Sequence, residues 1–293
     1  MKRPILLICS VILSISTANS VNAPKIIYGN DDRYESTEYP DAVFRDLAKS
    51  TAGMVRNSSL TEERGSILSD DSKSTGMFTF NSFRTLERTM NVCNTERFAK
   101  QVMLPRCSGF LVAPDILVTA GHCVTNEYDC QNYSWIFDYV KGTEKINKKN
   151  IFKCKKIISR KQTMGVFATK DYAVIKLDRV PENRTPLEIR IKGSIKKGTE
   201  LVVIGHPSGL PLKIADGARV TTKRWNFFYS NLDTYAGNSG SAVFNRKTGV
   251  VEGILIQGAT DYVANGSCNV SKRTSNSNAK EKIFKITKVK GLK

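Results

Sequence analysis

The sequence predicts an all-β protein in which two antiparallel barrels form one domain. Short apolar or alternating runs recur between turn signals, and two of them flank the Pro114-Asp115 turn as a hairpin from Ser108 to Cys123. A second series of such runs extends from Leu201 to Gln257 and predicts the second barrel. The chain has 293 residues, of which 40% are apolar and 25% charged, so it can bury the core of such a domain.

Residues 1–23 predict a secretory signal peptide. Lys2 and Arg3 precede an apolar run from Ile5 to Ile15, and small residues follow it. The run is too short, and its end too polar, for a stable membrane anchor, and no transmembrane segment is expected. We therefore expect the mature chain, residues 24–293, to be secreted or periplasmic.

The cysteine count predicts disulfides rather than a metal site. Seven cysteines become six once Cys9 leaves with the signal peptide, and six cysteines in an exported protein allow about fifteen pairings. Zinc is disfavoured because no CxxC motif occurs and both histidines lie in other contexts. We expect no metal and no organic cofactor.

The formal charge is +18, and basic residues are concentrated in residues 145–156. A run of like charges is usually a solvated face, and the functional alternative is that it attracts anionic surfaces. No zinc finger or aromatic RNP motif occurs, so no specific nucleic-acid partner is expected. The basic patch consists of Lys145, Lys148, Lys149, Lys153, Lys155 and Lys156.

The remaining segments have weaker signals. Asp41 to Lys49 has a short helical pattern. Asn57 to about Ser82 is rich in Ser, Thr, Asp and Gly, which predicts a surface insertion or a mobile loop. Pro181 to Lys197 is expected to cross between the barrels. Glu281 to Lys290 predicts a C-terminal helix because apolar residues recur there at helical spacing, at Ile283, Ile286 and Val289.

A serine between small residues, in Gly237-Asn238-Ser239-Gly240-Ser241, is a candidate nucleophile. A serine hydroxyl needs a neighbouring base and backbone donors for the oxyanion that forms. Flanking glycines allow a tight turn whose N–H groups point into one concavity. The alternative is an ordinary turn between two strands.

The candidate base is His122, one of only two histidines. It lies at the end of the hairpin, where a strand ends. Asp171 opens the apolar run Asp171 to Leu177, and a carboxylate at the head of a core strand is costly to bury without a partner such as an imidazole N–H. The other histidine, His206, precedes a proline turn and is interpreted as structural.

Together, the motifs TAGHC, DYAVIKL and GNSGS, in the order His, Asp, Ser, resemble the trypsin and chymotrypsin superfamily of serine endopeptidases. The resemblance covers roughly residues 25 to 270 and implies two six-stranded antiparallel β-barrels with a short C-terminal helix. It places His122 and Asp171 in a first barrel, about residues 24–180, and Ser239 in a second, about 181–293. With Asn238 and Ser241 at these positions, the serine motif resembles that of the bacterial branch that includes the glutamyl endopeptidases.

The same resemblance implies one disulfide, Cys107 to Cys123, across the histidine hairpin. The pairing of the other cysteines is left open, with Cys130 to Cys154 and Cys93 to Cys268 as the leftover assignment. The segment from Ile26 to Val55 resembles the N-terminal arm and first strand of the bacterial branch.

The resemblance also implies a mechanism. Ser239 is the nucleophile, His122 the general base and Asp171 the residue that orients the imidazole, while the N–H groups of Gly237 and Ser239 receive the oxyanion. The expected partners are protein or peptide substrates, and the expected state is a monomer. An inactive protease-like module that binds anionic partners is the competing function, and an esterase is a third.

The implied substrate-binding residues are Asp233, Thr234 and Gly258. Asp233 lies six residues before Ser239, at the offset where trypsins hold the acid that pairs with a substrate Lys or Arg. Alternatively, Asp233 caps its own turn. Glutamyl specificity is a further alternative, although Leu255 occupies the place where the glutamyl endopeptidases have a histidine.

Overall fold

The computed structural model describes residues 27–64, 74–81, 84–163, 165, 169–258, 261–276 and 280–292. The expected signal peptide, residues 1–23, lies outside them. Strands dominate the described residues, and the three α-helices among them are short: α1 (Ala42–Ala48), α2 (Leu86–Met90) and α3 (Glu127–Asn132). None of these helices has the length and apolar character that a membrane span requires.

The first barrel is closed by six antiparallel strands in the order β10-β11-β7-β6-β3-β8. The predicted hairpin forms as β6 and β7, and the run that begins at Asp171 lies in β11. The bounds are β3 (Thr51–Arg56), β6 (Cys107–Ala113), β7 (Ile116–Thr119), β8 (Tyr133–Ile136), β10 (Ile151–Thr163) and β11 (Lys170–Leu177).

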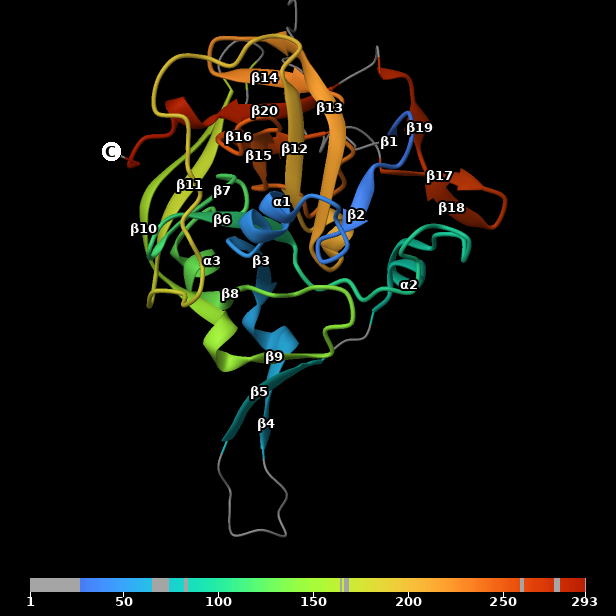
Figure 1. Ribbon diagram of the computed structural model, residues 1–293. Helices are drawn as coiled ribbons and strands as arrows, with labels where there is room; N and C mark the ends of the chain where they lie inside the picture. The colour runs from blue at the N-terminus through green and yellow to red at the C-terminus, as the bar shows by residue number, and fades with distance from the viewer. Residues whose placement is uncertain are drawn as a thin grey trace, which may run out of the picture.

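The second barrel has the strand order β12-β15-β16-β20-β14-β13 and closes through pairing of β12 with β13. The two barrels lie one above the other in Figure 1. The prediction of two six-stranded antiparallel barrels is therefore confirmed. The bounds are β12 (Glu200–Gly205), β13 (Lys213–Lys223), β14 (Phe227–Ser230), β15 (Ala242–Asn245), β16 (Val251–Gln257) and β20 (Glu281–Lys285).

The predicted C-terminal helix is wrong. Its residues form β20, which lies between β14 and β16, followed by the 3₁₀ turn η5 (Ile286–Lys288). Ile283 and Phe284 are both buried because β20 is covered on both faces, and the Phe284 ring stacks on Tyr172 of the first barrel at 5.5 Å between centroids. The spacing of Ile283 and Ile286 thus reflects a strand followed by a turn.

The N-terminal residues join the second barrel rather than the first. β1 (Ile27–Tyr28) pairs in parallel with β19 (Arg273–Thr274), and β2 (Arg33–Glu35) pairs with β13 as a seventh strand of that sheet. The expected division at about residue 180 therefore does not describe this arm. One apolar cluster, which includes Trp135 and Phe244, runs through both barrels.

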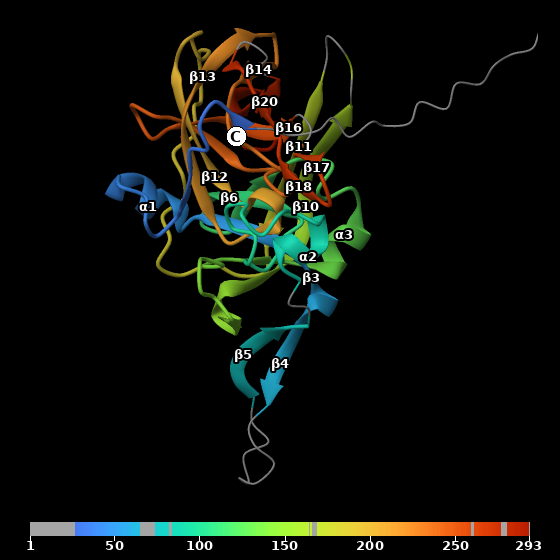
Figure 2. The same ribbon diagram turned by 90° about the vertical axis from the view of Figure 1, so that its right-hand side faces the viewer.

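The predicted surface insertion contains a β-hairpin. β4 (Leu60–Arg64) pairs with β5 (Ser74–Phe80), and β5 pairs with β9 (Lys145–Asn147). The hairpin projects from the body in Figures 1 and 2. The remaining short 3₁₀ turns are η1 (Asn57–Ser59), η2 (Lys148–Asn150) and η3 (Pro207–Gly209).

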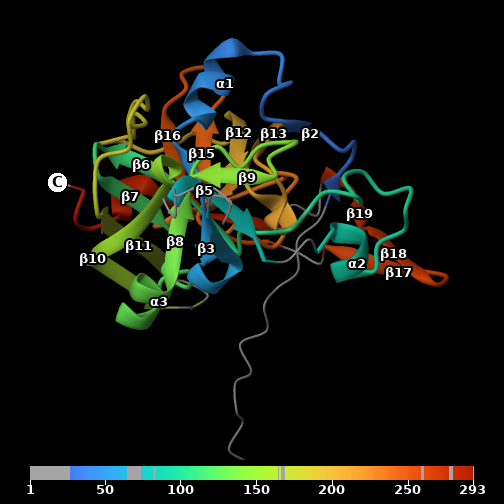
Figure 3. The ribbon, with the colours of Figure 1, turned by 90° about the horizontal axis from the view of Figure 1, so that it is seen from below.

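Three disulfides join the described cysteines: Cys93–Cys268, Cys107–Cys123 and Cys130–Cys154. The first ties the segment after α2 to the small hairpin of β17 (Tyr262–Asn265) and β18 (Cys268–Ser271). Figure 3 shows α2 beside this hairpin, on the side of the molecule away from the first barrel. The two leftover pairs are those that elimination had suggested.

Candidate active site

The imidazole of His122 and the carboxylate of Asp171 are in direct contact. Nδ1 of His122 lies 2.7 Å from Oδ2 of Asp171, and the backbone N–H of His122 donates to Oδ1 at 2.9 Å. Asp171 is buried, with its side chain 2% exposed, while the His122 side chain is 31% exposed. A carboxylate on Nδ1 fixes the tautomer and leaves Nε2 available to accept a proton.

The first barrel places these two residues through strand pairing. β7 and β11 are neighbours, with Ala173 opposite Thr119, so the end of β7 meets the start of β11. The guanidinium of Arg160 in β10 donates to the carbonyls of Gly121 and Val124, at 2.9 and 3.0 Å. These contacts hold the main chain on both sides of His122.

The turn that carries Ser239 packs against the same part of the first barrel. The carbonyl of Ser239 accepts the N–H of Ser108 at 2.8 Å and lies 3.7 Å from Sγ of Cys123, the residue after His122. Gly240 has φ +89°, and a Cβ there would lie 2.1 Å from the carbonyl oxygen of Ser108. Only glycine allows the turn to approach β6 so closely.

Gly237 is suited to donate to an oxyanion. It has φ +91°, and an added Cβ would lie 2.5 Å from the carbonyl oxygen of His206. Its carbonyl accepts the hydroxyl of Ser108 at 2.9 Å. Its N–H has no acceptor within the part of the chain that the structure describes. A backbone donor without an internal acceptor can serve developing negative charge.

His206 lies apart from this arrangement. It is 1% exposed, its Nδ1 lies 2.9 Å from the carbonyl oxygen of Leu210, and its ring stacks on Tyr139. Burial lowers its pKa to about 4, so the ring is neutral at pH 7. These contacts agree with the structural role predicted for it.

The three predicted substrate-binding residues are all buried. Oδ1 of Asp233 accepts the N–H of Tyr28 at 2.7 Å, and Oδ2 accepts the N–H of Asp32 at 3.0 Å. Asp233 therefore caps the N-terminal arm rather than its own turn. The Thr234 hydroxyl donates to Glu281, and Gly258 directly follows β16.

Sequence reasoning missed Tyr28, Asp32 and Glu281 at this place. Tyr28 and Glu281 are buried beside Asp233 and Thr234 although they lie near opposite ends of the described chain. A buried Glu in an apolar strand was the one available signal, because such a carboxylate needs donors. The helical interpretation of residues 281–290 concealed it.

One grouping of possible metal ligands occurs among the described residues, namely Cys107, His122 and Cys123. Both sulfurs belong to the Cys107–Cys123 disulfide, so neither can supply a thiolate. This cluster therefore does not fit a metal ion.

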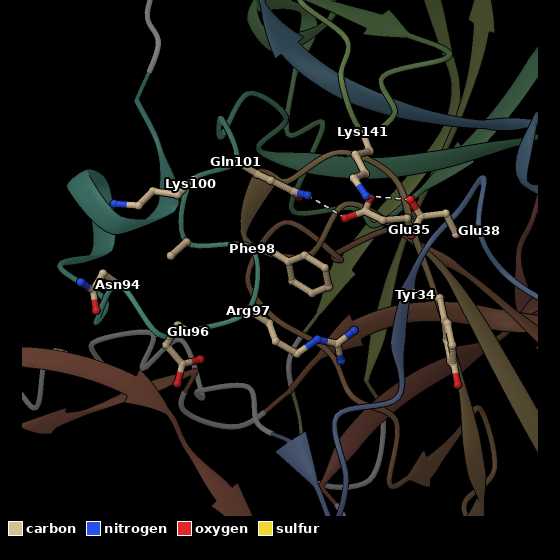
Figure 4. A pocket seen from close by; sticks show the side chains of 11 residues that line it. Tyr34, Glu35, Glu38, Asn94, Glu96, Arg97, Phe98, Lys100, Gln101 and Lys141 are labelled. Atoms are coloured by element: carbon tan, nitrogen blue, oxygen red, sulfur yellow. Dashed lines mark hydrogen bonds and ion pairs between the residues drawn. The ribbon is translucent and has the colours of Figure 1, made fainter.

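A separate hollow of about 400 Å³ lies between β2 and the loop of residues 94–101 (Figure 4). Phe98 and Arg97 line it from the loop, and Tyr34 and Glu35 line it from the arm. Arg97 and Glu35 are engaged in polar contacts with protein groups, with Arg97 bonded to the arm and Glu35 to Gln101. The hollow therefore marks a junction between the loop and the arm.

Two solved structures have a similar fold. A Glu endopeptidase is 19% identical, covers 90% of this chain and 94% of its own, and superposes with a TM-score of 0.52. An inactive form of the Rv3671c protein of M. tuberculosis H37Rv is 13% identical, with coverages of 91% and 94% and a TM-score of 0.50. At these identities the likeness concerns the fold alone. No curated protein sequence matches this chain.

The family model of the trypsin-like peptidase domain matches residues 107–254, which is half of the chain. The matched region begins at β6, ends in β16, and contains His122, Asp171 and Ser239. Because this model matches half of the chain and the fold has two barrels, the chain belongs to the trypsin-like peptidase family of serine endopeptidases.

Proposed function

We propose that this protein is an exported serine endopeptidase that cleaves peptide bonds through Ser239, His122 and Asp171. The observation that carries the proposal is the contact of the half-exposed His122 ring with buried Asp171, 2.7 Å apart, beside the turn that carries Ser239. A buried carboxylate behind an accessible imidazole is the arrangement that a general base requires.

In this mechanism His122 accepts the proton of Ser239 as Oγ attacks the substrate carbonyl, and an acyl-enzyme forms. His122 then gives that proton to the leaving amine, and water releases the acyl group by the reverse steps. Asp171 holds the tautomer and stabilises the imidazolium. The N–H groups of Gly237 and Ser239 receive the oxyanion, and loss of one such donor costs about 10² to 10³ in kcat.

A fluorophosphonate probe tests the proposal. It should label the wild type and spare Ser239→Ala, because the probe reacts only with an activated serine. Ser159→Ala, in β10, is the matched control and should be labelled like the wild type. Absence of serine-dependent labelling in a folded protein would contradict the proposal and favour a binding module.

For the residue preference we propose cleavage after Lys or Arg. Supporting it, the buried carboxylate of Glu281 accepts the Thr234 hydroxyl at the predicted pocket, where negative charge favours a cationic side chain. Leu255 is buried and apolar, which gives an acidic side chain no partner. A peptide library decides: cleavage after Lys and Arg supports the proposal, and cleavage after Glu replaces it with glutamyl specificity.

The competing function, an inactive module that holds anionic partners, rests on part of the basic patch. Lys145 and Lys148 pair with Glu63 and Glu62 of the β4–β5 hairpin. The rest, Lys149 in η2 and three lysines of β10, are exposed and have no carboxylate within 4 Å among the described residues. In a catalytic protein these lysines would still bind anionic partners, and that binding would not depend on Ser239. The three in β10 are Lys153, Lys155 and Lys156.

Export is supported by the disulfides. Three disulfides among the described cysteines fit an oxidising compartment outside the cytosol. We propose that residues 1–23 are removed and that residues 24–293 act in the periplasm or outside the cell. N-terminal sequencing of the active form, together with cell fractionation, tests both statements.

A further inference from the structure

The N-terminal arm, defined as residues 27–35, is attached to the body at points that do not involve the site. Its first strand pairs with β19 and its last with β13. The guanidinium of Arg97 donates to the arm's carbonyls at Asp31, at 2.8 Å, and Arg33, at 2.7 Å. Buried Lys213 donates to the carboxylate of Glu35 at 2.8 Å. The arm is therefore a fixed support.

The site segment, defined as residues 233–239, contacts this support twice. Asp233 accepts one N–H on each carboxylate oxygen, from Tyr28 at 2.7 Å and from Asp32 at 3.0 Å. Two residues later, the ring of Tyr235 lies 4.2 Å from the guanidinium carbon of Arg33. Arg33 is itself buried and paired with Asp31, so it is fixed in place.

The two N–H groups confine the Asp233 side chain. Asp233 is 3% exposed, and a carboxylate in that environment depends on its hydrogen bonds for stabilisation. If it turned toward a substrate cation, the buried N–H of Tyr28 and the partly buried N–H of Asp32 would lose their acceptor, and a buried donor without an acceptor is costly. We propose that Asp233 is a positioning residue that ties the site segment to the arm, rather than a residue that contacts the substrate.

This tie determines the geometry of the groups that react in the proposed function, on which the inference rests. Asp233 and Ser239 are the two ends of the site segment, and the N–H of Asn238 donates to the carbonyl of Tyr235 at 3.0 Å. Movement at Asp233 is therefore transmitted to the N–H of Gly237 and to Ser239. A misplacement of about 1 Å in such a site can lower turnover by about 10²-fold.

The test uses Asp233→Asn, which keeps the shape but replaces one acceptor by an NH₂ group. Ser239 reactivity is measured with a small neutral alkyl fluorophosphonate, which has no side chain for a specificity pocket. We expect labelling and kcat to fall by about 10- to 10²-fold, and by the same factor for basic and neutral peptide substrates. Glu252→Gln, a buried carboxylate paired with Arg190 in the same barrel, is the control.

Hydrogen exchange supplies a readout that is independent of activity. In the wild type the amides of Tyr28 and Asp32 should exchange slowly, and in Asp233→Asn they should exchange at least about 10-fold faster. In Glu252→Gln both amides should keep the wild-type rate.

Two results would overturn the inference. One is an unchanged labelling rate with a loss confined to Lys and Arg substrates, which would make Asp233 the substrate partner. The other is unchanged exchange of both amides. If Asp233→Asn does not fold, Asp233→Ser, whose hydroxyl can accept one N–H, gives the same comparison. If the wild type shows no serine-dependent labelling, the proposed function fails, while the exchange result still decides the tie.

Discussion

Asp171 and Asp233 are both buried carboxylates that accept two hydrogen bonds, but they bind different parts of the molecule. Asp171, 2% exposed, binds the backbone and the ring of a single residue, His122. Asp233, 3% exposed, binds two backbone amides of the distant N-terminal arm. The partner therefore defines the role: one carboxylate orients a group that can exchange protons, and the other fixes the position of a chain segment.

Asp171→Asn should give the largest difference between the two residues. An amide in place of the carboxylate favours the wrong imidazole tautomer, so kcat should fall about 10⁴-fold at neutral pH. KM should change little, and the exchange of the Tyr28 amide should stay at the wild-type rate. Steady-state kinetics measures the effect, and a loss below about 10-fold would break the comparison.

The titration of Asp233 should be visible in the pH dependence of the free energy of unfolding. Burial, assisted by the Asp31 carboxylate, raises the pKa of its carboxyl to about 7 against the opposing effect of the two amides and Arg33. The folded protein thus holds this proton more tightly than the unfolded chain, so about 4 kcal/mol of stability is lost as pH rises from about 4 to 7. Urea unfolding of the wild type should show this decline.

The same measurement on Asp233→Asn should lack that decline, since an amide does not titrate. The stability of the variant relative to the wild type should therefore increase between pH 4 and pH 7. An identical pH dependence in the two proteins would show that the buried carboxyl does not titrate in this range.

His206 gives the opposite slope in the same barrel. Burial, assisted by the nearby charge of Lys213, lowers its pKa to about 4 against the opposing hydrogen bond to Leu210. Stability from this residue is present above about pH 6.5 and is lost as pH falls toward 4, by about 3 kcal/mol. His206→Gln should remove this acid-side loss in urea unfolding, which separates it from the contribution of Asp233.

Glu63→Gln supplies the smallest effect and the baseline for a carboxylate that is not buried. Glu63 of the β4–β5 hairpin pairs with Lys145 of β9, and the two side chains are 35% and 46% exposed. Surface ion pairs contribute about 0 to 1 kcal/mol, so Tm should change little and kcat should not change. A loss above about 1 kcal/mol would indicate a further role for the hairpin.

Local sequence patterns were sufficient for the elements around Asp171. The alternating runs predicted β6, β7 and β11, and the His122 motif lies at the end of a strand as expected. The surroundings of Asp233 were not predictable in the same way. Its partners lie 205 and 201 residues away, and no periodicity encodes which distant backbone amides a carboxylate will meet.

One wrong prediction and one sheet that was not predicted have the same physical origin. The apolar residues of 281–290 have a spacing that fits a helix. Residues 281–285 nevertheless form β20, which pairs with β14 and β16 as one of the six strands of the second barrel. The polar segment after Asn57 has the composition of a loop, yet β5 finds a partner in β9 and forms a sheet. In both cases pairing with a distant strand overrides the local preference.

The long separation between Tyr28 and Asp233 also bears on when this molecule becomes functional during its synthesis. The arm leaves the ribosome early, but its partners in β13, β19 and the site segment are among the later parts to emerge. Chains with such non-local pairings fold slowly. A nascent chain that ends shortly after Ser239 therefore lacks β19, the partner of β1, and competence for hydrolysis should appear only after that strand has also emerged.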